Sequence, residues 1–359
     1  MILSKEAATP EALAAEARDI SRRFDVRSVD ELLHFPQYFQ VETTRLCNAR
    51  CPFCPSDIWD KKTPYMSDAL YKKVADEIIE HRDWVKFVDL QRAGEPLLDK
   101  KIYERVGYMK DGGVKFVALT TNASGLTEEN ARKLLAAGID EVMLSIDSVE
   151  KEKYEQMRVG LKYEQVMANI RGFFRLRDEL KPDCIIRVRG VSFYDPSVPA
   201  DLAEIESWER FWDDMKKPHD RIYMKRAHTW GNQRVVEGHS PVYDWVYHPC
   251  VIPFSTMHVT AMGIVALCPQ DFDATIELGD VNHNTIVEVW RGEKMRAMRA
   301  LHMSGNRNDV SLCRGCRLFD EEFSLERNKD VWAGTAVPKK DGPVTLTLEG
   351  IAQPAKRLV

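Results

Sequence analysis

Three cysteines lie within one short stretch of the chain, at Cys47, Cys51 and Cys54, with the spacing C-x3-C-x2-C. A cysteine thiolate is a soft ligand that suits both zinc and iron–sulfur clusters. Three thiolates on one loop can bind three irons of a [4Fe–4S] cluster, which leaves the fourth iron open. A structural zinc loop and buried apolar cysteines are the alternatives, but zinc usually takes four ligands in C-x2-C pairs. The spacing therefore favours a cluster with one open iron.

Four further cysteines form a second group toward the C-terminus. Cys250 stands alone, Cys268 ends a predicted hairpin strand over Gly263–Cys268, and Cys313 and Cys316 form a C-x2-C pair. Four thiolates can complete the coordination of a [4Fe–4S] cluster, and they also suit tetrahedral zinc. A cluster held by all four has no open iron, so we expect it to transfer electrons or support structure and not to bind substrate.

The composition is that of an ordinary globular protein, with 44% hydrophobic and 30% charged residues in a chain of 359. This length suits one large domain and a smaller one. The net charge of −5 argues against nucleic acid as the main partner, and no apolar run is long enough for a membrane span. The charged N-terminus reads as a helix and not as a signal peptide.

Patterned cysteines favour metal over disulfides, and an oxygen-sensitive cluster needs a reducing, cytoplasmic location.

Strands and helices alternate along the part of the chain that carries the first cysteine group. Ser67 is predicted to cap a helix with Leu70, Val74 and Ile78 on one face, and Thr127 to cap another. A long amphipathic helix is expected over 163–180. Strands are predicted at 38–43, 85–90, 114–120, 141–146, 184–191 and 221–224. This alternation predicts an α/β fold with a parallel sheet, either a partial barrel or a doubly wound sheet.

Polar motifs stand where these predicted strands end, which is where parallel-sheet active sites lie. The cysteine loop follows the first strand, and Ala93-Gly94-Glu95-Pro96 follows the second. Thr120-Thr121-Asn122 ends the third strand, and Ser145-Ile146-Asp147-Ser148 ends the fourth. Ordinary turns and helix caps are the simpler interpretation of each motif taken singly.

Taken in this order, the motifs resemble those of the radical S-adenosylmethionine (radical SAM) superfamily. The resemblance implies a partial (β/α)6 barrel whose open iron is chelated by the amino and carboxylate groups of SAM. The reduced cluster then cleaves SAM to a 5′-deoxyadenosyl radical, which abstracts a hydrogen atom from substrate. Ala93 departs from the family's Gly-Gly-Glu-Pro motif. The implied cofactor-binding residues are Gly94, Glu95, Asn122, Ser145, Asp147 and Arg158, the last pairing with the SAM carboxylate.

The second cysteine group resembles the SPASM/twitch extension of radical SAM enzymes, a β-hairpin and helix that hold an auxiliary cluster. Four cysteines match the shorter twitch form with one [4Fe–4S] cluster. The expected organisation is a helical lead-in over 1–36, the barrel over 37–235, the SPASM/twitch domain over 236–325 and a tail over 326–359. In the tail, residues 344–349 alternate as a strand does.

A fully ligated auxiliary cluster is an electron acceptor, which favours dehydrogenation over epimerisation, elimination or decarboxylation. Epimerisation usually needs a hydrogen donor, often a cysteine. Cys184 is the one cysteine left over, and we expect it to be buried at the start of a strand, at the end of the barrel away from the active site. The sequence therefore predicts a dehydrogenase-type oxidoreductase.

The small segments outside the two domains favour a sugar or aminocyclitol of natural-product (antibiotic) biosynthesis over a ribosomal peptide as substrate.

Arg187 and Arg189 point to the same side of their strand. An unpaired arginine inside a sheet is costly, so we expect at least one of the two to line the active-site pocket. The candidate catalytic residues are Arg189, His228 and Asp271, with His228 or an aspartate as the base. The expected partners are a small-molecule substrate and an electron donor such as flavodoxin or ferredoxin. A two-cluster electron carrier and a zinc-stapled binding protein are the hypotheses outside radical chemistry.

Overall fold

The computed structural model describes residues 9–57, 59, 62–193, 198–233 and 248–316. The strand expected at 344–349 lies outside these residues. Within them, nine strands form one sheet in the order β6-β5-β4-β3-β2-β1-β7-β8-β9. Their bounds are β1 (Tyr38–Val41), β2 (Phe87–Asp89), β3 (Val117–Thr121), β4 (Glu141–Ser145), β5 (Ile185–Ser192), β6 (Arg221–Arg226), β7 (Thr256–Val259), β8 (Ile264–Ala266) and β9 (Glu277–Asp280).

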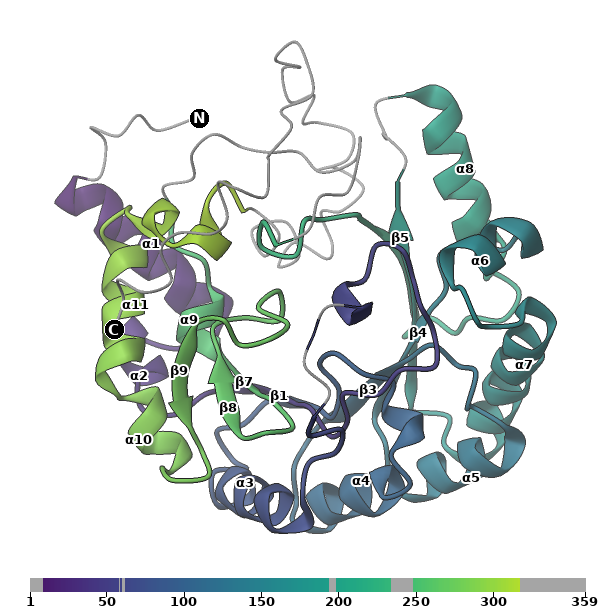
Figure 1. Cartoon of the computed structure of the whole chain (residues 1–359), viewed down its shortest axis with the longest axis horizontal. Helices are drawn as coiled ribbons and strands as arrows, with labels where there is room; N and C mark the ends of the chain where they lie inside the picture. Colours follow the sequence, from purple (N-terminus) through teal and green to yellow (C-terminus); the bar gives the residue numbers. More distant parts are fainter. Residues whose placement is uncertain (1–8, 58, 60–61, 194–197, 234–247, 317–359) are drawn as a thin grey trace.

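Strands β1 to β6 are parallel and follow one another in sequence order across the sheet. A doubly wound sheet would reverse its order, so the partial barrel is the correct alternative. Figure 1 shows the connecting helices along the outside of the curved sheet. These helices are α3 (Asp68–Glu80), α4 (Ile102–Asp111), α5 (Glu128–Ala136), α6 (Lys151–Met157), α7 (Tyr163–Leu180) and α8 (Pro199–Arg210).

Local sequence signals place the ends of these helices as predicted. The Ser67 side chain accepts a hydrogen bond from the Leu70 amide at the start of α3, and Thr127 accepts one from the Asn130 amide at the start of α5. Leu70, Val74 and Ile78 are buried. The helix expected over 163–180 is α7, which has the same limits.

The cysteine-rich C-terminal region extends the barrel's own sheet. Strand β7 pairs in parallel with β1, and β8 and β9 continue the sheet as antiparallel strands. Short helices complete the region, namely α9 (Ile252–Ser255), α10 (Ile286–Trp290) and α11 (Glu293–Met303), with 3-10 turns η3 (Arg307–Asp309) and η4 (Ser311–Cys313). The two cysteine groups are therefore carried by one continuous sheet. The predicted boundary at 235/236 stays a prediction, since it lies outside the described residues.

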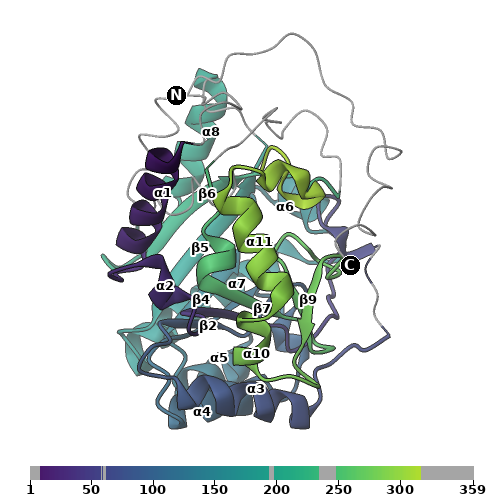
Figure 2. The same ribbon diagram turned by 90° about the vertical axis from the view of Figure 1, so that its left-hand side faces the viewer.

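The N-terminal helices α1 (Pro10–Arg23) and α2 (Val29–Leu32) pack against this C-terminal region. Ile20, Phe24 and Leu32 share a buried apolar cluster with Ile252 and its neighbours. The indole N–H of Trp290 donates to the Leu32 carbonyl at 2.9 Å. Figure 2 shows α1 on the same side of the molecule as α11. The lead-in segment therefore helps to hold the last part of the sheet in place.

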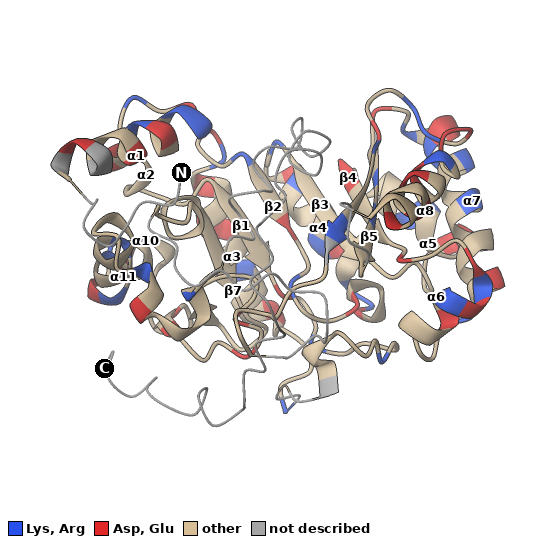
Figure 3. Cartoon of the chain, turned by 90° about the horizontal axis from the view of Figure 1, so that it is seen from above, with Lys and Arg blue, Asp and Glu red and all other residues tan. Residues whose placement is uncertain are grey.

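Acidic and basic residues are mixed on the helices that surround the sheet. Figure 3 shows both kinds together on helices such as α1, α7 and α8. Across the described ranges, none of the helices combines the length and apolar character needed to cross a membrane.

Candidate active site and auxiliary cluster pocket

The three-cysteine loop leaves β1 and rests directly on the turn after β2. The Glu95 amide donates to the Leu46 carbonyl at 2.7 Å. A Cβ atom added at Gly94 would lie 2.3 Å from the Thr44 carbonyl oxygen and 2.6 Å from that of Leu46. Backbone cannot move aside as a flexible side chain can, so Gly94 is needed for this close contact. The resemblance assigned Gly94 to SAM binding, and the structure gives it this additional role.

The Glu95 carboxylate joins the ends of β2 and β3. It accepts from the Thr121 hydroxyl and the Asn122 amide, each at 2.7 Å, and from the Leu97 amide at 3.1 Å. Burial raises the pKa of Glu95, and these donors act against that shift. The carboxylate is thus occupied by protein donors beneath the cysteine loop.

Asn122 supports the cysteine loop from the end of β3. Its side-chain amide donates to Asn48 Oδ1 at 2.9 Å and lies 4.0 Å from Cys47 Sγ. Burial raises the pKa of the Cys47 thiol to about 11 and that of Cys51 to about 12. Without metal these two cysteines are therefore thiols, and binding of iron must displace their protons.

Asp147 and Arg158 are paired with each other. Arg158 Nε donates to Asp147 Oδ2 at 2.5 Å and Nη2 donates to Oδ1 at 3.0 Å, and the guanidinium lies over the Phe53 ring at 5.6 Å. Among the described residues, Arg158 Nη1 makes no hydrogen bond and neither does the Ser145 hydroxyl. The pairing was not predicted, but it leaves one face of the guanidinium available for a carboxylate ligand.

The inner face of the barrel sheet carries polar side chains. The opposite face carries apolar ones such as Val142 and Val188, which are fully buried. Ser145 lies opposite Arg189 in the register of β4 and β5, so both side chains point inward at the carboxyl ends of the strands. Arg187 pairs with Glu141 at 2.7 Å, whereas Arg189 forms no ion pair or hydrogen bond within the described residues.

Asp89 lies deeper on the same inner face, on β2 opposite Gln40 of β1. It is 4% exposed, and its Oδ1 has no hydrogen-bond partner within the described part of the chain. Burial and the nearby Glu141 raise the pKa of Asp89 to about 7, while Arg189 acts in the opposite direction. A buried carboxyl with such a pKa suits proton transfer near neutral pH.

His228 lies after β6, within the electrostatic influence of Arg189. Burial, Lys225 and Arg189 lower its pKa well below the usual value, so the ring is neutral. Nδ1 accepts from the Trp230 amide at 3.3 Å. In this tautomer Nε2 carries the proton, and His228 is a hydrogen-bond donor instead of the expected base.

The structure argues against Asp271 as the catalytic base. Its carboxylate accepts from the hydroxyl and the amide of Thr275, each at 2.7 Å, and from the amides of Ile276 at 3.1 Å and Leu267 at 3.4 Å. The residue is fully buried. These bonds shape the loop that follows Cys268 and engage both oxygens of the Asp271 carboxylate.

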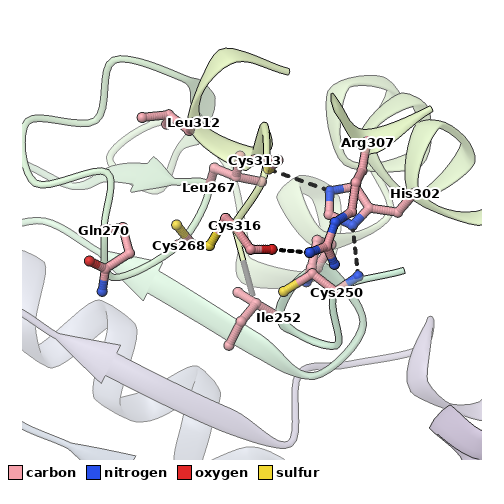
Figure 4. A pocket seen from close by; sticks show the side chains of 11 residues that line it. Cys250, Ile252, Leu267, Cys268, Gln270, His302, Arg307, Leu312, Cys313 and Cys316 are labelled. Atoms are coloured by element: carbon pink, nitrogen blue, oxygen red, sulfur yellow. Dashed lines mark hydrogen bonds between the residues drawn. The ribbon is translucent and has the colours of Figure 1, made fainter. Parts of the chain in front are cut away.

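Cys250, Cys268, Cys313 and Cys316 line one pocket, together with apolar residues, His302 and Arg307 (Figure 4). None of the chain's eight cysteines is in a disulfide. Four thiols at one pocket suit an iron–sulfur cluster held by all four, and they also suit tetrahedral zinc.

The two cysteine groups are joined by a buried charge network. Arg45, two residues before Cys47, donates to Asp273 Oδ1 at 2.7 Å and to the Phe272 carbonyl at 3.3 Å. Arg92 donates to the same carbonyl at 2.9 Å. These bonds tie the three-cysteine loop to the loop that follows Cys268.

Cys184 is fully buried directly before β5, at the end of the barrel opposite the cysteine loop. Burial raises the pKa of its thiol to about 12. The prediction of a buried apolar role is confirmed.

Comparison with known proteins agrees with this geometry. Residues 41–181 match the radical SAM superfamily model, and residues 250–317 match SPASM, an iron–sulfur cluster-binding domain. The S-adenosyl-L-methionine-dependent 2-deoxy-scyllo-inosamine dehydrogenase of Niallia circulans is 22% identical over 280 residues, covering 77% of this chain and 91% of the relative.

Solved structures show the same fold at low identity. BtrN in complex with AdoMet and 2-DOIA matches with a TM-score of 0.54 and 20% identity, over 78% of this chain and 92% of that chain. Native anSMEcpe with bound AdoMet and Cp18Cys peptide matches with a TM-score of 0.53 and 15% identity, over 82% of this chain and 98% of that chain.

The chain therefore belongs to the radical SAM superfamily and carries a C-terminal SPASM domain. It is a radical SAM enzyme, whose cofactors are SAM, the SAM-binding [4Fe–4S] cluster and an auxiliary iron–sulfur cluster. The donors fit these groups, because one loop offers three thiolates and the pocket of Figure 4 offers four.

Sequence reasoning missed Asp89, Arg45, His302 and Arg307. The acidic residue near the end of the predicted strand 85–90 was a usable signal for Asp89. The other three stand in stretches with no distinguishing pattern, so the sequence offered no comparable signal for them.

Proposed function

We propose that this enzyme oxidises a secondary alcohol of a small, polar ring compound, an aminocyclitol or sugar, to a ketone. The observation that carries the proposal is the complete four-cysteine pocket on the same sheet as the SAM site. All eight cysteines are then accounted for, and no ligands remain for a second auxiliary cluster. Similarity to a 2-deoxy-scyllo-inosamine dehydrogenase over both domains supports this substrate class.

We assign the cluster ligands by pocket. Cys47, Cys51 and Cys54 hold the SAM-binding cluster, and Cys250, Cys268, Cys313 and Cys316 hold an auxiliary [4Fe–4S] cluster. The SAM-binding cluster supplies reductive cleavage of SAM when bound, and the auxiliary cluster supplies an electron acceptor. Oxidation of the alcohol removes one hydrogen atom from the carbinol carbon, one proton from the hydroxyl and one electron.

The free Nη1 of Arg158 is positioned to bind the SAM carboxylate, while Asp147 holds the guanidinium in place. Gly94, Glu95 and Asn122 keep the loop in the geometry that SAM requires. The inward-facing Ser145 hydroxyl is a further candidate contact for SAM.

Arg189 and His228 are proposed to bind substrate. Both lie near the carboxyl ends of β5 and β6, and both are donors, which suits hydroxyl oxygens. Asp89 replaces Asp271 as the proposed proton acceptor, because its Oδ1 faces the inside of the barrel without a partner in the described residues.

A flavodoxin or ferredoxin in the cytoplasm is the proposed electron donor for SAM cleavage. The similarity to peptide-bound anSMEcpe concerns the fold alone, so it does not favour a peptide substrate.

The test is anaerobic turnover of 2-deoxy-scyllo-inosamine that carries deuterium at its carbinol carbons. We expect the ketone, one deuterium in 5′-deoxyadenosine and one SAM consumed per product. Retention of the alcohol, with solvent deuterium at an inverted carbon when the reaction runs in D2O, would instead demonstrate epimerisation. SAM cleavage with no change in any aminocyclitol or sugar would sink the substrate assignment.

A further inference from the structure

His302 contacts the auxiliary pocket through both ring nitrogens. It lies in the last turn of α11 and is 1% exposed. Nδ1 accepts a hydrogen bond from the Cys250 amide at 3.1 Å, and Nε2 lies 3.7 Å from Cys313 Sγ, as Figure 4 shows. Because Nδ1 accepts, the proton of the neutral ring is on Nε2. The ring therefore directs an N–H group at a cysteine sulfur.

Arg307 brings a positive charge to the same cysteines. It is 1% exposed, and its Nη1 donates to the His248 carbonyl at 2.9 Å. Its Nη2 donates to the carbonyl of Cys316. These bonds hold the buried guanidinium beside the C-x2-C end of the pocket, so its positive charge lies close to the cysteine residues.

We propose that His302 and Arg307 raise the reduction potential of the auxiliary cluster, the former through a hydrogen bond to Cys313 and the latter through its buried charge. Reduction adds one electron and one negative charge to the thiolate-bound cluster. Hydrogen bonds to the sulfurs and nearby positive charge stabilise that state, and the low dielectric constant of a buried site strengthens both effects.

The three-cysteine loop has donors of its own. The Cys47 sulfur accepts from the Ala49 amide at 3.5 Å, and the nearby Arg158 is paired with Asp147. In the auxiliary pocket, two of the donors of Arg307 go to neutral carbonyls. A higher potential at the auxiliary cluster favours its reduction by the substrate radical, which is the direction that oxidation of the substrate requires.

The experiment is a potentiometric titration of the full chain, followed by electron paramagnetic resonance (EPR), in a Cys47→Ala/Cys51→Ala/Cys54→Ala background. This background retains only the auxiliary cluster. At the midpoint potential of the parent protein, we expect His302→Leu to lower the ratio of reduced to oxidised cluster about tenfold. For a one-electron couple this equals a fall in midpoint potential of about 59 mV. His302→Gln should restore most of the potential, because its amide can accept from Cys250 and donate to Cys313. Arg307→Gln should lower the potential and Arg307→Lys should restore it.

Arg299→Gln is the matched control, because Arg299 is also buried on α11 but bonds to the Pro253 and Trp290 carbonyls and not to a cysteine residue. It should leave the potential unchanged. Equal potentials in the parent, His302→Leu and Arg307→Gln, with iron retained, would overturn the proposal.

A second measurement tests the hydrogen bond even if His302→Leu or Arg307→Gln loses its iron. With His302 and Arg307 unchanged, ¹⁵N-histidine labelling should change the pulsed EPR spectrum of the reduced cluster, and His302→Gln should abolish that change. A spectrum insensitive to the label would also overturn the proposal. Neither readout needs substrate or turnover, so both are independent of the proposed function.

Discussion

The two cysteine groups are built in opposite ways. The loop of Cys47, Cys51 and Cys54 gathers its sulfurs within one turn of chain, and the ends of β2 and β3 support it from below through Gly94 and Asn122. The auxiliary pocket collects its cysteines from several separate elements. Cys250 lies two residues before α9, Cys268 follows β8, and Cys313 and Cys316 lie at and after the end of η4. One site depends on local spacing and the other on the complete tertiary fold.

This difference has consequences for stability. A local loop keeps its ligands close together even when the surrounding structure loosens. The auxiliary pocket closes only when the extension of the sheet, α11 and the N-terminal helices are in place, as the contact of Trp290 with Leu32 indicates. Occupation of the auxiliary site should therefore report on folding of the whole chain, since ligands that bind only the folded state stabilise it.

Removing the ligands of the three-cysteine site should distinguish the two clusters most clearly. In Cys47→Ala/Cys51→Ala/Cys54→Ala we expect the iron content to fall from about eight to about four per chain, with complete loss of SAM cleavage. Iron and sulfide analysis after anaerobic reconstitution, with detection of 5′-deoxyadenosine, measures both. About four irons in the unmodified protein and none in the variant would contradict an auxiliary [4Fe–4S] cluster.

Removing ligands of the second site should have the reverse effect. In Cys268→Ala/Cys313→Ala we expect formation of 5′-deoxyadenosine to continue while the ketone falls to background, because the electron acceptor is missing. Chromatography of both products from one reaction measures the ratio. Cys184→Ala is the matched control, since this buried cysteine lies at the far end of the barrel. Undiminished ketone in the double variant would refute the electron-acceptor role.

Asp89 and Asp271 provide a comparison between two buried carboxyls. We expect Asp89→Asn to lower ketone formation by about 10²- to 10⁴-fold with SAM cleavage retained, the usual range for loss of a general base. Asp271→Asn should instead reduce iron in the auxiliary site, because its carboxylate organises the loop after Cys268. Rates and iron contents of the two variants distinguish these roles. A normal rate in Asp89→Asn would remove it from the mechanism.

The pH dependence follows from the pKa of Asp89, which is raised to about 7. A base must be deprotonated, so oxidation should become faster as pH rises through about 7. Stability should change in the opposite direction. The folded state holds this proton above the unfolded pKa of about 3.9, so the free energy of unfolding decreases as pH rises between these two values. Denaturant titrations across this range should show a smaller decrease in Asp89→Asn, and an equal decrease would contradict the assignment.

Local patterns made much of the fold predictable. Spacing alone identified the three-cysteine loop, and capping by Ser67 and Thr127 with the periodicity of α7 located the helices. These features depend on residues close together in sequence.

The partners of polar side chains were less predictable. The pairing of Arg158 with Asp147, the pairing of Arg45 with Asp273 and the approach of His302 to Cys313 are set by how the chain folds back on itself. Residue type and spacing do not encode such contacts, so the supports of the auxiliary pocket had to come from the structure.

The smallest effect that still distinguishes the two cysteine sites is expected from adding one methyl group, at Gly94. Gly94→Ala places a Cβ atom 2.3 Å from the Thr44 carbonyl, and overpacking of this kind costs about 1–3 kcal/mol. We expect partial loss of iron from the three-cysteine site, with the auxiliary site still full, as measured by the iron content and the EPR signals of the two clusters. Gly107→Ala is the matched control, because its Cβ would meet nothing within 4 Å on helix α4 and should stabilise that helix by up to about 1 kcal/mol. Equal iron contents in both variants would show that the turn after β2 does not determine the geometry of the cysteine loop.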